Sequence, residues 1–160
     1  MGVAIIAVLA LCLIMVRGLT VTHPPEFART FSTNLFHYGA APFVWMPEEL
    51  DIVVTGPNTF CDLETNPASV RNAIVVTLLA TTGTCPTQLR ILRAQAAGAS
   101  AFVFASADEV EWQQLPTTIH IERIHLEDYN VLDRYASAAP HRRLLGSVGV
   151  EADPGLDVPW

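Results

Sequence analysis

Cysteine is the most reactive residue type in this chain of 160 residues, and it occurs as Cys12, Cys61 and Cys85. Cys12 lies in an uncharged apolar run, residues 1–16, which has the length of a signal-peptide core and is short for a membrane span. If residues 1–18 are removed, two cysteines remain in a chain bound for an oxidising compartment. This favours a disulfide between Cys61 and Cys85 over two free buried thiols or a redox-active pair. A metal site is disfavoured because the two lack Cys-x-x-Cys spacing.

The N-terminal run also carries the features of a cleavage site. Val16 and Gly18 are small enough to stand third and first before a cut at Leu19. No basic residue precedes the run, so an uncleaved signal-anchor is the alternative. We expect residues 1–18 to be a signal peptide, and the protein to be secreted or held in an endomembrane lumen.

Histidine, serine and acidic residues are the other side chains here that could act in catalysis. His120 and His125 flank Glu122, but their odd spacing on a strand would point the two rings to opposite faces. The segment 146–149 reads Gly-Ser-Val-Gly and lacks the residue that a nucleophile elbow places between glycine and serine. Adjacent acidic pairs have diverging carboxylates, typical of solvated faces or helix starts: Glu48–Glu49 and Glu127–Asp128. We therefore expect no catalytic residue, no metal ligand and no cofactor site.

The charge of the chain excludes two classes of partner. It has 16 acidic residues against 9 basic ones, a net charge of −7, and every basic residue is an arginine. Nucleic-acid binding without sequence preference and polybasic membrane anchoring both need clustered positive charge. We expect neither.

The middle of the chain predicts a strand, a helix and a second strand. Residues 73–79 are continuously apolar and rich in β-branched side chains, as in a strand buried on both faces. Residues 86–97 have helical periodicity, begin with proline and end before Gly98. Residues 101–105 are again apolar. This order is a βαβ unit, so the two strands are expected to be parallel.

Other elements flank this unit. Residues 19–30 are predicted to be extended and loop-like because Pro24 and Pro25 block regular pairing, although the alternation of Phe27, Arg29 and Phe31 could start a strand. Three further strands and one helix are predicted: strands 50–55, 117–124 and 144–150, and helix 126–136.

Several short motifs follow one another along this pattern. They are an early cysteine, a buried strand, a Gly-x-Cys turn, a helix with a basic residue and an Ala-Gln pair, an Ala-Gly-Ala segment and an apolar strand. They stand here as Phe60-Cys61-Asp62-Leu63, Ile74–Leu79, Gly83-Thr84-Cys85, Arg90, Ala94-Gln95, Ala97-Gly98-Ala99 and Phe102–Phe104. Their order and spacing resemble the protease-associated (PA) domain. The departures are Thr82, Thr87 and Arg90, where the family often has arginine, an aromatic residue and lysine.

The resemblance implies an α/β fold of the swivelling β/β/α type, in which helices flank a curved sheet with one βαβ unit. It covers nearly all of the chain after the signal peptide. We divide the chain into a signal peptide (1–18), an N-terminal extension (19–34), the PA domain (35–152) and a C-terminal tail (153–160).

The resemblance also implies a function without catalysis. PA domains are lumenal or extracellular modules that bind proteins or peptides, so we expect a partner-binding domain with no membrane span in the mature chain. The alternative is an ectodomain fragment of a larger PA-containing membrane RING ubiquitin ligase, protease or sorting receptor. Aromatic side chains are the candidates for partner contact, although several must belong to the core: Phe36, Tyr38, Phe43, Trp45 and Trp112. No single binding residue is predicted.

Overall fold

The structure is a computed structural model that describes residues 17–35, 49–61, 70–79, 85–106 and 117–150. It contains seven strands, two α-helices and one short 3-10 helix within these ranges. Their bounds are β1 Arg17–His23, η1 Pro25–Phe27, β2 Arg29–Leu35, β3 Leu50–Thr55, β4 Ala73–Leu79, α1 Thr87–Ala96, β5 Ala101–Ser106, β6 His120–Ile124, α2 Leu126–Ala138 and β7 Leu144–Val150.

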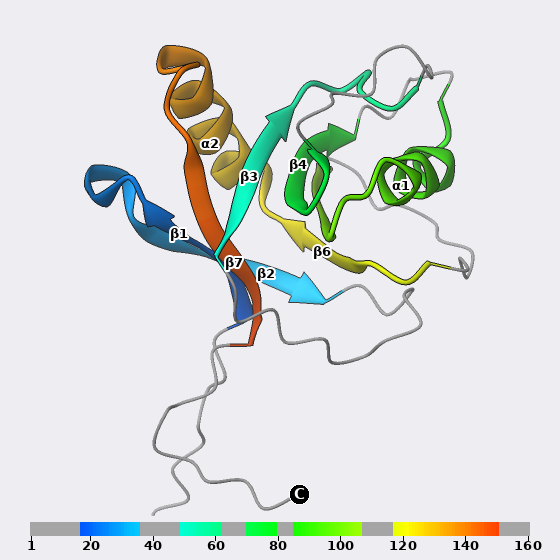
Figure 1. The fold of residues 1–160 in the computed structure, drawn as a ribbon, viewed down its shortest axis with the longest axis horizontal. Coiled ribbons are helices and arrows are strands. Elements are labelled where there is room, and N and C mark those ends of the chain that lie inside the picture. The colour runs from blue at the N-terminus through cyan, green and yellow to red at the C-terminus, as the bar shows by residue number, and fades with distance from the viewer. Residues whose placement is uncertain (1–16, 36–48, 62–69, 80–84, 107–116, 151–160) are drawn as a thin grey trace, which may run out of the picture.

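The strands form a closed barrel in the order β1-β2-β6-β5-β4-β3-β7, and β7 pairs with β1 to close it. Neighbouring strands from β3 to β6 are parallel. The remaining pairs are antiparallel. The two helices lie apart in Figure 1, with α2 against β3, β4 and β5, and α1 against β5.

One apolar core fills the barrel. Each of the seven strands contributes buried side chains to it, and α2 adds Tyr129 and Leu132. In β4 and β5 the contributing residues alternate along the strand, as Ile74 and Val76 do in β4. Side chains at alternate positions of a strand share a face, so these residues point into the barrel.

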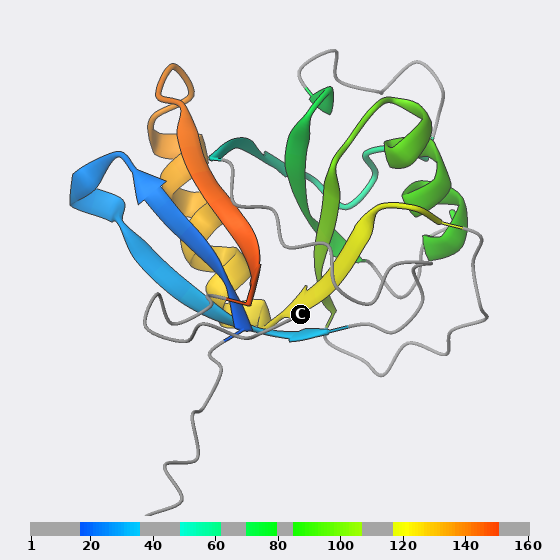
Figure 2. The ribbon, with the colours of Figure 1, turned by 60° about the horizontal axis from the view of Figure 1, so that its bottom comes forward.

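A second core lies outside the barrel, beneath α1. Val75 of β4 and Phe102 of β5 point to this side, opposite to their neighbours in sequence, and they meet Ile91 and Ala94 of α1. The ribbon in Figure 2 shows α1 on the flank of the barrel beside β5. Strands β4 and β5 are therefore covered on both faces, which explains their continuous apolar sequence.

The predicted elements agree closely with the observed ones. Strands 50–55, 73–79 and 144–150 have the predicted bounds, and the strand predicted at 101–105 continues by one residue. The βαβ unit is confirmed, since β4 and β5 are parallel. Gly98 has a φ of 91° and follows Ala97, the C-cap of α1, as expected of a glycine that ends a helix.

The α/β class with two helices beside a sheet is confirmed, and two details of the prediction change. The expected curved sheet closes into a seven-stranded barrel. Residues 19–30 are not loop-like, because β1 occupies Arg17–His23 and pairs with β2 and β7. Pro24 and Pro25 fall in the turn between β1 and β2, where a missing N–H group removes no pairing.

The barrel includes part of the N-terminal sequence. β1 begins two residues before the predicted cleavage point, and β1 and β2 span the segment predicted as an extension, 19–34. Residues 1–16 and 151–160 lie outside the described ranges, so the signal peptide, the tail and the domain boundaries stay predictions. None of the helices in the described ranges is long and apolar enough to cross a membrane.

Candidate functional site

The two cysteines retained after signal removal lie together at one end of the parallel strands. Cys61 follows β3 after a short turn, and Cys85 stands two residues before α1. Both are half-buried free thiols, and their side chains lie close enough for Cys61 to raise the pKa of Cys85. The fold thus brings the two residues into contact, whereas the disulfide itself stays a prediction.

Arg90 of α1 anchors this end of the barrel. Its guanidinium donates from Nε to the Thr59 carbonyl oxygen at 2.9 Å and from Nη1 to the Leu78 carbonyl oxygen at 3.1 Å. Its Nη2 donates to Thr77 Oγ1 at 2.7 Å. Arg90 is buried, and burial lowers the pKa of its guanidinium. These bonds tie α1 to β4 and to the turn after β3 through neutral acceptors.

Arg93 and Tyr129 extend the same network. Arg93 donates from Nη1 to the carbonyl oxygens of Phe60, at 3.1 Å, and Cys61. The Tyr129 hydroxyl of α2 donates to the Thr55 carbonyl oxygen at 3.0 Å. Burial raises the pKa of Tyr129 to about 12, and the nearby Asp133 adds to this, so the hydroxyl stays protonated at neutral pH. Both helices thus satisfy backbone carbonyls at and beyond the end of β3.

A second polar pair points into the barrel from β6. His120 Nε2 lies 2.6 Å from Glu122 Oε1, and the two side chains are 7% and 1% exposed. They share a strand face with Ile124, which belongs to the barrel core. In the described part of the chain, Glu122 Oε2 and Thr33 Oγ1 have no hydrogen-bond partner.

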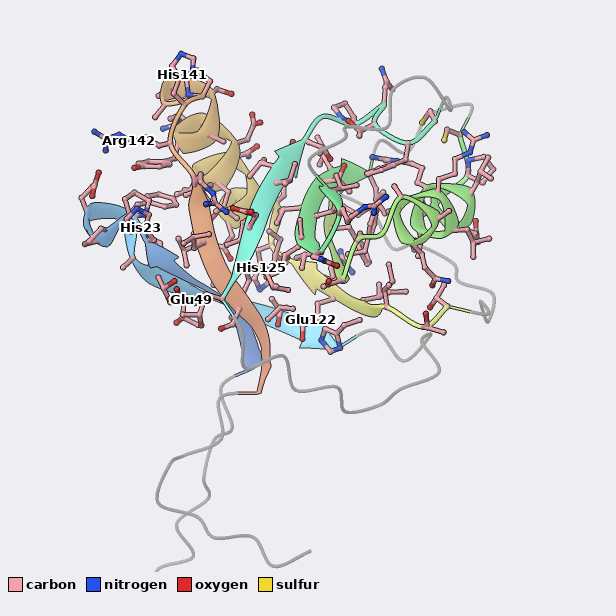
Figure 3. The ribbon with its side chains drawn as sticks, in the orientation of Figure 1. His23, Glu49, Glu122, His125, His141 and Arg142 are labelled. Carbon is pink, nitrogen blue, oxygen red and sulfur yellow. The ribbon has the colours of Figure 1, made fainter. Side chains whose placement is uncertain are left out.

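The two histidines of this region differ in exposure. His120 is half-buried and lies beside Glu122 on the same strand face. His125 is exposed at the start of α2, and Figure 3 labels it together with Glu122 of β6. Across the described ranges, no three histidine, cysteine or acidic side chains are grouped so that they could hold a metal ion.

The remaining candidate residues lie on the surface, in a helix start, in a strand or outside the described ranges. Glu49 is exposed, and Glu127 and Asp128 lie in the first turn of α2, where acidic side chains are favourable. Ser147 lies in β7, paired with Thr20 of β1. The aromatic candidates for partner contact lie outside the described residues: Phe36, Tyr38, Phe43, Trp45 and Trp112.

Sequence reasoning missed the part played by the two arginines. The sequence marks Arg90 only as the basic position of a resemblance, and it assigns no role to Arg93. The available signal was the spacing, because residues three apart on a helix face the same side. That side of α1 meets the turn that carries Cys61.

The environment of Cys85 predicts slow alkylation of the reduced protein at neutral pH. Burial, together with the Cys61 side chain, raises the pKa of Cys85 to about 11. Thiolate is the reactive form, so the rate with iodoacetamide should rise about tenfold per pH unit from pH 7 to pH 10. The measurement follows the Cys85 peptide by mass spectrometry. In Cys61→Ser the thiol neighbour is lost and the profile should shift to lower pH. A rate that levels off below pH 9 in the unsubstituted protein would contradict this.

Comparison with protein families matches residues 48–131 to the PA domain. The match runs from just before β3 into α2 and includes both cysteines, Arg90 and Arg93. No curated protein sequence matches the chain.

Several solved peptidase structures share the fold. An aminopeptidase from Aneurinibacillus sp. strain AM-1 is 13% identical with a TM-score of 0.58, over 84% of this chain and 30% of that one. The zinc aminopeptidase BSAP from Bacillus subtilis is 15% identical with a TM-score of 0.55, over 84% and 30%. The peptidase M28 precursor from Shewanella amazonensis SB2B is 13% identical with a TM-score of 0.56, over 83% and 34%. This chain therefore corresponds to about a third of each of these proteins.

Proposed function

Because the chain belongs to the PA domain family, we propose that it is a non-catalytic module that binds protein or peptide partners. The family match carries this proposal, since it covers the parallel strands, α1 and the start of α2. The arrangement of polar groups supports it. Arg90 and Arg93 direct their donors to the protein's own backbone, and the His120–Glu122 pair is enclosed in the barrel.

We further propose that the module works in the secretory pathway, with Cys61 and Cys85 joined by a disulfide. The apolar segment at residues 1–16 and the contact between the two thiols support this. Expression of the full chain in secreting cells should give protein in the medium that begins at Leu19. Retention in the cell membrane with an intact N-terminus would instead identify a signal-anchor.

A second candidate is that the same domain acts as part of a larger protein. The peptidases with this fold are about three times as long as the region that matches them, which favours this alternative. In that case the domain would contact, or regulate access to, a neighbouring domain of a protease, a RING ubiquitin ligase or a sorting receptor.

Binding can be tested with the immobilised full chain and a random peptide library. We expect selective retention of peptides without their hydrolysis. Trp45→Ser and Trp112→Ser test the aromatic candidates, and Leu89→Ser is the matched control because Leu89 is an exposed apolar residue on α1. Loss of retention in the tryptophan variants alone supports the proposal. Cleavage of the peptides, or no retention by the unsubstituted chain, would contradict it.

A further inference from the structure

We propose that Arg93 is a positioning residue that holds Cys61 against Cys85 and so promotes their pairing. The inference rests on the disulfide of the proposed function, and it names the device that makes the bond favourable. It is drawn from the contacts of α1 with the turn after β3.

Helix α1 controls the positions of both cysteines. Cys85 is tied to it covalently, because Pro86 is its N-cap and Thr87 its first residue. Cys61 is tied to it by hydrogen bonds, because three successive carbonyls of its turn accept from arginines of α1. These are Thr59, bound by Arg90, and Phe60 and Cys61, bound by Arg93. One rigid helix therefore sets the distance between the two sulfur atoms.

The turn that carries Cys61 needs such support. Phe60 has a φ of 66°, in the left-handed region that residues other than glycine rarely adopt. Its side chain is fully buried in the core beneath α1, and its carbonyl is bound by Arg93. A strained conformation persists only where the surroundings enforce it. Burial of Phe60 and the bonds from Arg93 supply that enforcement.

The covalent step is an ordinary thiol–disulfide exchange with a low-molecular-weight disulfide such as oxidised glutathione. One cysteine thiolate attacks the glutathione disulfide and releases one glutathione thiolate. The other cysteine then attacks the protein sulfur of the mixed disulfide and releases the second glutathione. Two protein thiols lose two protons and two electrons, and oxidised glutathione becomes two reduced glutathione molecules.

Because the fold already holds the two cysteines close together, the second cysteine has a high effective concentration at the mixed disulfide. Without the hydrogen bonds from Arg93, the end of the turn that carries Cys61 is no longer held to α1. The sulfur atoms of Cys61 and Cys85 then spend less time in contact. Coupling also works in reverse, so the disulfide should stabilise the contacts of Arg93 with the turn by the same factor.

The test equilibrates the folded full chain in buffers of varied reduced and oxidised glutathione, and measures the bridged fraction by alkylation and mass spectrometry. Relative to the unsubstituted chain, Arg93→Gln should lower the effective concentration of the pair about tenfold, equivalent to about 1.4 kcal/mol. Arg93→Lys should recover part of the loss because it keeps one charged donor. Arg134→Gln is the matched control, since Arg134 is exposed on α2, and it should leave the value unchanged.

The outcomes separate the two proposals. If the unsubstituted chain forms no bond between Cys61 and Cys85, the disulfide of the proposed function fails. If that bond forms equally well in Arg93→Gln, the disulfide stands and the role of Arg93 is overturned. The same measurement in denaturant distinguishes an effect of position from one of local charge, because all variants should then agree. Should Arg93→Gln fail to fold, Arg93→Lys against Arg134→Gln decides the question.

Discussion

Replacing Gly146 by alanine is expected to lower the free energy of unfolding by about 3 kcal/mol. Gly146 lies in β7 between the two neighbours of that strand, paired with Val21 of β1 and with Leu50 of β3. A Cβ atom there would fall far inside contact distance of the Thr20 carbonyl oxygen and 2.8 Å from the Ile52 Cδ1 atom. The obstacle is backbone, so relief requires that β1 and β7 separate where the barrel closes.

Gly56→Ala is the matched control for this prediction. A Cβ atom on Gly56 meets nothing within 4 Å, so this variant should differ from the unsubstituted protein by less than about 0.5 kcal/mol. Urea unfolding of the three proteins, all reduced, gives the comparison. A Gly146→Ala protein as stable as the control would show that the close approach of β1 and β7 does not limit closure.

The same glycine illustrates what the sequence can and cannot tell about the fold. Apolar patterning was enough to predict β7 at 144–150 with its observed bounds, because the period of two is a local property. The need for glycine at position 146 depends on Thr20, far away in the chain. Closure into a barrel depends on the pairing of β1 with β7 in the same way. Long-range pairing has no local signal, so the sequence predicts a curved sheet but not its closure.

The candidate site was likewise predictable from the sequence only in part. Composition pointed to Cys61 and Cys85 as a pair, and the fold brings them into contact. The part played by Arg93 was not predictable, because its acceptors are backbone carbonyls, which every residue carries. The His120–Glu122 pair was missed for another reason. A carboxylate on a strand is expected to face solvent, whereas Glu122 points into the barrel core.

Replacing Arg90 by methionine is expected to lower the free energy of unfolding by about 3 kcal/mol. Methionine preserves most of the apolar stem, but it removes every donor. The carbonyl oxygens of Thr59 and Leu78 would then be left without their arginine partner. Leaving a buried acceptor unpaired costs about 1 to 3 kcal/mol. The relief from burying a charged group offsets part of that cost.

Arg90→Lys separates the contribution of charge from that of geometry. Lysine keeps the charge but presents its donors from one nitrogen, so it cannot reach all of the acceptors that lie around the edge of the planar guanidinium. The Arg90→Lys protein should be more stable than Arg90→Met and less stable than the unsubstituted protein. Arg134→Met, on the exposed face of α2, should change the free energy of unfolding by less than about 0.5 kcal/mol. Urea unfolding of the reduced proteins checks the order. If the Arg90→Met protein proved as stable as the unsubstituted one, the cost of desolvating the Arg90 charge would equal the whole contribution of its hydrogen bonds. Such a balance is found for some buried ion pairs.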